Sequence, residues 1–272
     1  MFYCVFFKGY TINESINKVL EHSLQQAIKV YSNATDASVY VADKIAQLIK
    51  AKQEKGDLAI LGLATGSTPK GVYRELVRLH QSEGLSFQNV VTFNLDEYYP
   101  MHPVEDQSYV TFMKQNLFNH IDIPVNHIHI PDGTLALNAI QAYCDLYEKK
   151  IADFGGLDMQ LLGIGRSGHI GFNEPGSLQG SLTRLVQLDA ITREDAADDF
   201  GGMEKVPTQA ITMGIQTIVQ AKQIFLLALS ERKAEIIQKA LKGEISSAIP
   251  ATFLQQLEQV EYVLDHKAAA LL

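Results

Sequence analysis

The sequence is poor in cysteine and in positive charge. Its 272 residues contain two cysteines, Cys4 and Cys144, without the spacing of a metal site. Free thiols are typical of a reducing compartment, so we expect a cytoplasmic protein. Lysine and arginine total 23 against 31 acidic residues, a formal net charge of -8. Nucleic-acid-binding proteins normally carry a basic face, so we expect no nucleic-acid partner. An anionic small molecule stays compatible, because local backbone dipoles can outweigh a distant acidic surface.

Long apolar runs are absent as well. No stretch approaches the length that crosses a bilayer, so we expect no membrane partner. Residues 2–7 form a short aromatic cluster without the preceding positive charge and longer apolar core of a secretory signal. We treat residues 1–26 as an N-terminal extension of unknown role; an added strand, an interface segment and an extension from an upstream start codon all remain open. No linker or repeat divides residues 27–272, which we expect to form a single domain.

Apolar runs and amphipathic segments alternate along that domain. Runs such as 58–63 are apolar throughout, which is typical of central parallel strands buried on both faces. The predicted strands are 27–31, 58–63, 90–95, 157–163, 224–229 and 260–264. The predicted helices are 37–52, with Asn33 or Asp36 as its cap, and 69–81, 108–120, 135–153, 191–200 and 231–241. This alternation predicts an α/β fold, an open, doubly wound, mostly parallel sheet with helices on both faces, Rossmann-like.

The first candidate site follows the strand 58–63. Thr65, Gly66, Ser67 and Thr68 offer amides and hydroxyls at a turn, and the helix that begins at Pro69 directs its positive end into the same space. These features favour an anion seat, most plausibly for phosphate. The spacing is neither that of a nucleotide P-loop nor that of a dinucleotide fingerprint. The alternative is ordinary capping of the helix by serine or threonine.

The second candidate site is a pair of acids just past the strand 90–95. If the strand alternation continues, Asp96 and Glu97 point in different directions, so one can face a ligand while the other supports the backbone. A carboxylate in a partly closed pocket can have its pKa raised into the range useful for proton transfer. The alternative is a solvated acidic turn.

The third candidate site is the glycine-rich segment 163–176. It follows the predicted strand 157–163 and places His169 five residues before Glu174. Dense glycines let a backbone turn sharply and approach a ligand closely. A histidine held by a glutamate has a fixed tautomer and is a proton carrier near neutral pH. A surface turn with an incidental histidine is the alternative, but loops at the carboxyl ends of buried strands are where α/β proteins place their chemistry.

Together these three segments resemble the glucosamine-6-phosphate deaminase family. The resemblance rests on LGLATGSTP (61–69), FNLDEYY (93–99) and GIGRSGHIGFNEPGS (163–177), in this order, and extends over about residues 27–265. The related 6-phosphogluconolactonases share the fold and a similar phosphate loop. They usually differ after the loop histidine, where this chain has Asn173, Glu174 and Pro175.

The resemblance implies a reaction without metal or cofactor, the conversion of glucosamine 6-phosphate to fructose 6-phosphate and ammonia. It implies that His169 moves the proton of ring opening, oriented by Glu174. It implies that Asp96 carries a proton between C1 and C2 through an enolamine. The loop around Gly66 would hold the 6-phosphate, and Lys233 matches a family lysine that contacts this phosphate. A solvated lysine in the first turn of a helix is the alternative for Lys233.

Other functions stay open beside this one. Another amino-sugar phosphate, or a hydrolase like the lactonases, would suit the same fold. A sugar-phosphate sensor without catalysis would need a DNA-reading module, for which residues 1–34 are too short and too weakly basic. Relatives range from monomers to hexamers, so a homo-oligomer is possible.

The chain departs from the family at two places in the expected site. Well-studied members have an aspartate two residues before the loop histidine, where this chain has Ser167. Serine can form a hydrogen bond but supplies no charge to an imidazolium. An acid, Asp198, stands where the best-known branch has a phosphate-binding arginine. Arg193 or Arg184 could replace that arginine.

A further departure concerns regulation. Activated relatives use Ser, Arg, Lys and Thr after the NEP motif together with C-terminal residues. Ser177 and Arg184 match, but Val186 and Gln187 stand where Lys and Thr would be. The sequence also ends at Leu272, soon after its last predicted strand. We therefore expect little or no activation by N-acetylglucosamine 6-phosphate.

Overall fold

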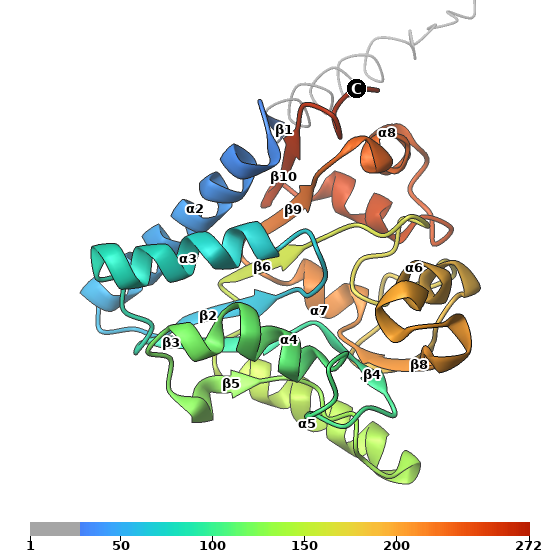
Figure 1. Cartoon of the computed structure of the whole chain (residues 1–272), viewed down its shortest axis with the longest axis horizontal. Coiled ribbons are helices and arrows are strands. Elements are labelled where there is room, and N and C mark those ends of the chain that lie inside the picture. Colours follow the sequence, from blue (N-terminus) through green and yellow to red (C-terminus); the bar gives the residue numbers. More distant parts are fainter. Residues whose placement is uncertain (1–27) are drawn as a thin grey trace, which may run out of the picture.

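The fold is built on a seven-stranded sheet in which every pair of neighbouring strands is parallel. The computed structural model describes residues 28–272, so the predicted extension 1–26 and the aromatic cluster 2–7 lie outside the described residues. The strand order is β1 (Ile28–Tyr31), β10 (Val260–Asp265), β9 (Ile224–Ala228), β6 (Met159–Leu162), β2 (Ala59–Leu63), β3 (Val90–Asn94) and β5 (Ile128–His129). The predicted doubly wound parallel sheet is confirmed (Figure 1). The single domain over 27–272 stays a prediction.

Helices cover both faces of this sheet because successive strand residues point to opposite sides. On β2, Leu61 and Leu63 pack in one apolar cluster with α2 (Ala34–Glu54), α3 (Lys70–Glu83) and α4 (Tyr109–Asn116). Ile60 packs in the other cluster, with α5 (Ile140–Asp153), α7 (Ile215–Val219) and α8 (Ala234–Lys242). All five residues of β2 are buried, which explains why its sequence is apolar throughout.

The predicted helices are present with shifted ends. Helix α2 begins at Ala34, three residues early, and Asn33 is its cap, accepting a hydrogen bond from Asp36 N at 2.9 Å. Single turns of 3₁₀ helix occupy parts of three predicted helices: η1 (Phe118–His120) follows α4, η3 (Leu137–Ala139) precedes α5, and η5 (Glu231–Lys233) precedes α8. The further 3₁₀ segments are η2 (Val125–His127), η4 (Met203–Lys205) and η6 (Pro250–Gln256).

A second, antiparallel sheet was not predicted from the sequence. Its order is β4 (Asp96–Tyr99), β8 (Gln209–Thr212) and β7 (Arg184–Gln187). The predicted helix α6 (Ala190–Phe200) lies between β7 and β8 in the chain. The acidic pair therefore stands in a strand, with Asp96 opposite Thr212 and Glu97 opposite Ile211. This small sheet adds a wall at the carboxyl edge of the parallel sheet.

Candidate active site

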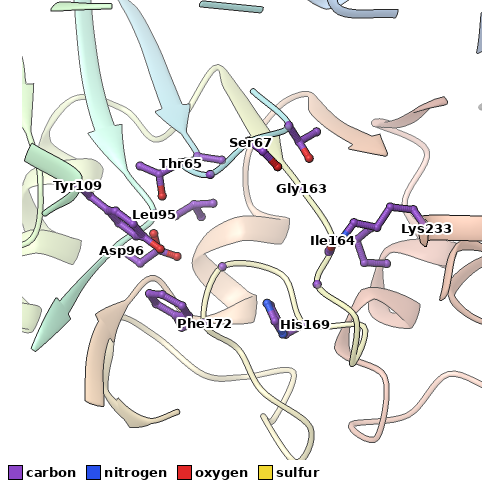
Figure 2. A pocket seen from close by; sticks show the side chains of 15 residues that line it. Thr65, Ser67, Leu95, Asp96, Tyr109, Gly163, Ile164, His169, Phe172 and Lys233 are labelled. Carbon is purple, nitrogen blue, oxygen red and sulfur yellow. The ribbon is translucent and has the colours of Figure 1, made fainter. Parts of the chain in front are cut away.

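A pocket of about 200 Å³ lies at the carboxyl edge of the parallel sheet, where ligands bind in open α/β folds. All three candidate segments reach it. Figure 2 shows Asp96 and Tyr109 on one side of the pocket, Lys233 on the other, and His169 between them below. The lining residues are Ala64, Thr65, Gly66, Ser67, Thr68, Leu95, Asp96, Tyr109, Gly163, Ile164, Gly165, His169, Gly171, Phe172 and Lys233.

The loop between β2 and α3 forms the polar end of this pocket. Gly66 has φ +94°, a conformation that side chains rarely adopt, and it lets the loop turn across the amino end of α3. The capping alternative is wrong, because Pro69 stands at the N-cap and no side chain of residues 28–272 caps the helix. Among the described residues, the hydroxyls of Ser67 and Thr68 and the amino end of α3 therefore have no partner that would compete with an anion.

Lys233 contributes the positive charge at this end. Its Nζ donates a hydrogen bond to the carbonyl oxygen of Ile164 at 2.8 Å. Burial lowers the pKa of Lys233, which indicates an ammonium short of solvation that an anion would stabilise. The alternative of a solvated lysine does not fit this placement.

Asp96 and Glu97 separate as the strand alternation predicts. Asp96 faces the pocket, whereas the buried carboxylate of Glu97 accepts backbone hydrogen bonds from Tyr98 at 3.0 Å and Tyr109 at 2.8 Å. Burial, and next the charge of Glu97, raise the pKa of Asp96 to about 8. Burial raises the pKa of Glu97 to about 7, although its backbone hydrogen bonds oppose the shift. Asp96 can therefore take up and return a proton near neutral pH.

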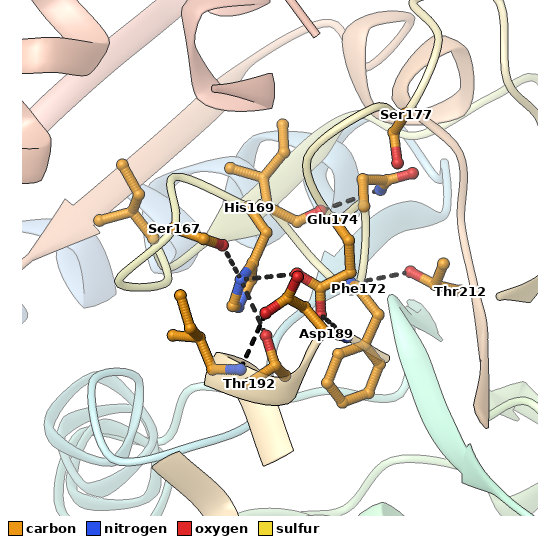
Figure 3. A network of polar contacts seen from close by, with 12 residues as sticks. Ser167, His169, Phe172, Glu174, Ser177, Asp189, Thr192 and Thr212 are labelled. Carbon is orange, nitrogen blue, oxygen red and sulfur yellow. Dashed lines mark hydrogen bonds and ion pairs between the residues drawn. The ribbon is translucent and has the colours of Figure 1, made fainter. Parts of the chain in front are cut away.

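Three groups converge on one ring nitrogen of His169. Nδ1 lies 2.9 Å from the Ser167 hydroxyl, 3.3 Å from Glu174 Oε2 and 3.4 Å from the Thr192 hydroxyl (Figure 3). Burial would raise the pKa of Glu174, but the hydrogen bond and charge of His169 outweigh it and hold that pKa below its usual range. Glu174 is thus an anion beside the His169 ring. Within residues 28–272 nothing hydrogen-bonds to Nε2, which is left for a ligand.

Two glycines allow the close approach of these groups. A Cβ at Gly165 would stand closer than 3.0 Å to the His169 ring, a contact that real side chains do not make. Gly171 has φ +56°, and a Cβ there would stand 3.0 Å from the Thr212 hydroxyl and 3.4 Å from Asp96 Oδ2. The loop backbone can lie against the His169 ring because it lacks a Cβ at Gly165, and the positive φ of Gly171 suits a residue without one.

Comparison with known proteins agrees with this geometry. The family model described as glucosamine-6-phosphate isomerases/6-phosphogluconolactonase matches residues 32–263. The chain belongs to this family. It is 45% identical to the glucosamine-6-phosphate deaminase of Oceanobacillus iheyensis over 232 residues, 85% of this chain and 89% of that protein. It is also 45% identical to a glucosamine-6-phosphate deaminase-like protein of Bacteroides thetaiotaomicron over 240 residues, 88% of this chain but only 36% of that longer protein.

Solved structures of the family have the same fold. A monomeric glucosamine-6-phosphate deaminase superposes with a TM-score of 0.85 at 44% identity, covering 90% of this chain and 99% of the other. The 6-phosphogluconolactonase of Trypanosoma brucei reaches 0.72 at 22% identity, covering 90% and 97%. At that identity the second match bears on the fold alone.

The structure does not bring the two expected arginines into the pocket of this family member. Nη2 of Arg193 donates to the carbonyl oxygens of Met203 at 2.9 Å and Val206 at 3.1 Å. The guanidinium of Arg184 bonds to Asn173 Oδ1 at 2.9 Å and to the Ser177 hydroxyl at 3.1 Å, beside a neighbouring cavity. Neither arginine lines the pocket that holds Asp96 and His169, and Asp198 is exposed on α6.

Sequence reasoning missed two residues of the site. Tyr109, in the first turn of α4, lines the pocket, and its ring stacks on Phe172 at 6.0 Å and 11°. Ser108, the N-cap just before Tyr109, marks the start of the helix in the sequence. It does not show in which direction the Tyr109 side chain points. Thr192 reaches His169 from α6, and no pattern near it signals that contact.

The described residues contain neither a candidate metal site nor a candidate membrane-spanning helix. No group of three His, Cys, Asp or Glu side chains within 28–272 could hold a metal ion. None of the helices over that range has both the length and the apolar composition to cross a membrane.

Proposed function

We propose that this protein converts glucosamine 6-phosphate to fructose 6-phosphate and ammonia. The observation that supports the proposal is that Asp96 and His169, whose side chains can carry a proton, line one small pocket together with Lys233 and the loop around Gly66. The relatives named as glucosamine-6-phosphate deaminases, at about 45% identity over most of their length, support the same substrate. We further propose that it acts in the cytoplasm, in amino-sugar breakdown, and that its oligomeric state is that of a monomer or a small homo-oligomer.

The first step is ring opening, for which His169 is suited. Nε2 accepts the proton of the C1 hydroxyl, the C1–O5 bond breaks, and the proton passes to the departing O5. Glu174, held as an anion, stabilises the imidazolium that forms in between. The product is the open-chain aldehyde with the 2-amino group in place.

The second step is the proton transfer from C2 to C1, for which Asp96 is suited. As a carboxylate it removes the C2 proton, the electrons move into the C1–C2 bond, and the C1 oxygen takes up a proton from solvent, which gives an enolamine. Asp96 returns its proton to C1, which leaves an iminium at C2. Water adds at C2, ammonia leaves as the C2 carbonyl forms, and one proton returns to solvent. The pKa of Asp96, raised to about 8 by burial and the charge of Glu97, favours both halves of this transfer.

The phosphate holds the substrate in place for both steps. The amino end of α3, the hydroxyls of Ser67 and Thr68 and the Lys233 ammonium bind a group that does not react. Binding energy from such a remote group positions the reacting carbons between Asp96 and His169.

The test measures ammonia and fructose 6-phosphate released from glucosamine 6-phosphate, with chelator present, by the wild type and by Asp96→Asn. We expect equal amounts of both products from the wild type and a loss of at least about 1,000-fold in the variant, since no carboxylate remains to move the proton. Thermal melting and phosphate binding serve as controls for folding and for the anion seat. Binding without ammonia release would favour another amino-sugar phosphate, a lactonase-like hydrolase or a sensor.

A further inference from the structure

The phosphate end of the pocket has less positive charge than its proposed ligand has negative charge. A phosphate monoester carries about -1.5 to -2 charges at pH 7. Among the described residues that line the pocket, the one lysine or arginine is Lys233, and its ammonium already bonds to the carbonyl of Ile164. A planar guanidinium that forms two parallel hydrogen bonds is the usual complement to phosphate. One ammonium therefore does not balance the charge of a bound phosphate, and a second cationic side chain would.

Arg166 stands in the segment that forms one wall of this pocket. Gly163, Ile164 and Gly165 directly before it line the pocket, and so does His169 three residues later. Nη2 of Arg166 lies 2.5 Å from Glu194 Oε2 and 3.1 Å from Asp195 Oδ1, both on α6.

These ion pairs are exposed and therefore easily exchanged. The side chains of Arg166, Glu194 and Asp195 are 54%, 65% and 46% exposed. Water and salt screen pairs of this kind, and holding two long side chains together costs conformational entropy. Arginine forms bidentate hydrogen bonds with phosphate as readily as with carboxylate, so a phosphate can replace these exposed partners.

The charges of this cluster already act on the pocket. Burial lowers the pKa of Lys233, the charge of Asp195 raises it, and the charge of Arg166 lowers it again. The opposite effects of these two charges on Lys233 are consistent with their pairing with each other. A phosphate bound at Lys233 would be attracted by Arg166 and repelled by Asp195.

We propose that Arg166 is a second phosphate-binding residue, which exchanges Glu194 and Asp195 on α6 for oxygens of the substrate's phosphate. The inference rests on the proposed function for the identity of the substrate, but the phosphate contact itself does not. In the structure the two acids hold the guanidinium against α6. When phosphate binds, Arg166 leaves Glu194 and Asp195 and bonds to the phosphate. Because the guanidinium is already held in place, little conformational entropy is lost.

The test uses inorganic phosphate as the probe, by titration calorimetry at low salt, on the full chain. We expect Arg166→Gln to weaken phosphate binding about tenfold, the size of a lost charge-assisted hydrogen bond. As a competitive inhibitor, phosphate should lose the same factor, and KM for the sugar phosphate should rise with kcat within about twofold, since the phosphate does not react. Arg166→Lys should restore part of the affinity.

Arg232 provides the matched control. It is exposed, and its charge also acts on Lys233, but it stands in η5 rather than in the pocket wall. Arg232→Gln should weaken phosphate binding less than threefold. Equal effects of the two substitutions, or wild-type affinity in Arg166→Gln, would overturn the proposal. Either result would mean that Arg166 makes no direct contact with the phosphate.

A double-mutant cycle tests the exchange itself. Replacing both acids (Glu194→Gln with Asp195→Asn) should tighten phosphate binding more in the presence of Arg166 than in the Arg166→Gln background. Equal gains in both backgrounds would count against the exchange. If calorimetry gives the expected pattern while no variant releases ammonia, the contact stands and the proposed function fails.

Discussion

The hydroxyl oxygen of Ser167 lies 2.9 Å from Nδ1 of His169, and Oε2 of Glu174 lies 3.3 Å from the same nitrogen. With the Thr192 hydroxyl at 3.4 Å, this side of the imidazole has two neutral partners and one charged partner. A hydroxyl can orient the ring, but it gives little electrostatic support to an imidazolium, whereas a carboxylate gives both. If the proposed function holds, we expect ring opening to depend on Glu174 for charge and on Ser167 for geometry.

The first prediction is that Ser167→Asp raises turnover. A second carboxylate beside Nδ1 would stabilise the imidazolium formed during ring opening, and the gain should be about threefold to tenfold in kcat. Ammonia release under saturating substrate measures it. Ser167→Ala, which removes the hydrogen bond without adding charge, is the control and should be no faster than wild type. An unchanged or slower Ser167→Asp enzyme would show that turnover is not limited by the lack of an aspartate at this position.

The second prediction concerns Glu97 and the pH profile. Because the charge of Glu97 helps to raise the pKa of Asp96, Glu97→Gln should lower that pKa. Asp96 acts as a carboxylate, so the acid limb of kcat/KM should move to lower pH by on the order of one unit. Asp106→Asn, an exposed acid of the following loop, should leave the limb in place. If the acid limb stays at the same pH in Glu97→Gln, that limb does not report the ionisation of Asp96.

The central sheet could be predicted from the sequence because its strands are buried on both faces. Runs such as that of β2 are apolar without interruption, and this pattern follows from burial alone. The glycines and polar residues just after β2, β3 and β6 then had to meet at one edge of a parallel sheet. The convergence of Ser67, Asp96 and His169 follows from topology, which explains why the site could be anticipated.

The antiparallel sheet and the arginine directions could not be predicted in this way. Strands β7 and β8, with sequences RLVQ and QAIT, are too short and too mixed to stand out, and their register depends on partners far along the chain. The guanidinium of Arg193 bonds to backbone carbonyls on the turn after α6. Such partners are set by tertiary structure, so a helix position cannot show whether an arginine faces the pocket.

The third prediction concerns stability. The buried carboxylate of Asp158 lies 2.7 Å from Lys222 Nζ and 2.9 Å from Lys52 Nζ, and it accepts a hydrogen bond from Ile60 N at 3.0 Å. Burial would raise its pKa, but the hydrogen bonds with Lys222 and Lys52 outweigh this and lower it. We expect Asp158→Asn to reduce the free energy of unfolding by about 2 kcal/mol at pH 7.

The pH dependence fixes the sign of this effect. The pKa of Asp158 in the folded protein lies below its unfolded value of about 3.9. Its ionised carboxylate therefore stabilises the fold fully at pH values above about 3.9, and this stabilisation is lost as the pH falls through the folded-state pKa. The difference between wild type and Asp158→Asn in urea unfolding should therefore shrink below about pH 4. Asp153→Asn, which removes an exposed pair with Lys149, is the control and should change stability by less than about 0.5 kcal/mol.

The fourth prediction is the absence of activation by N-acetylglucosamine 6-phosphate. The cavity beside the site has a volume of about 630 Å³ and is lined by Ser177, Arg184, Val186 and Gln187, among others. Arg184 is its one lysine or arginine within the described chain, and its guanidinium is already bonded to Asn173 and Ser177. We expect a hyperbolic substrate curve that the ligand shifts less than twofold. A sigmoidal curve that the ligand abolishes would contradict this.

The last prediction uses two glycines of the same loop. Gly163 and Gly165 both line the pocket and neither has a positive φ, so alanine is acceptable to the backbone at both. A methyl group at Gly163 meets nothing within 4 Å, whereas one at Gly165 overlaps the His169 ring. Gly165→Ala should therefore displace the imidazole by about 1 Å and lower kcat about 100-fold, with little change in phosphate affinity. Gly163→Ala should keep kcat within about twofold. Melting temperatures of both variants identify a loss of fold, and equal activities in two folded variants would mean that the position of His169 is not what limits turnover.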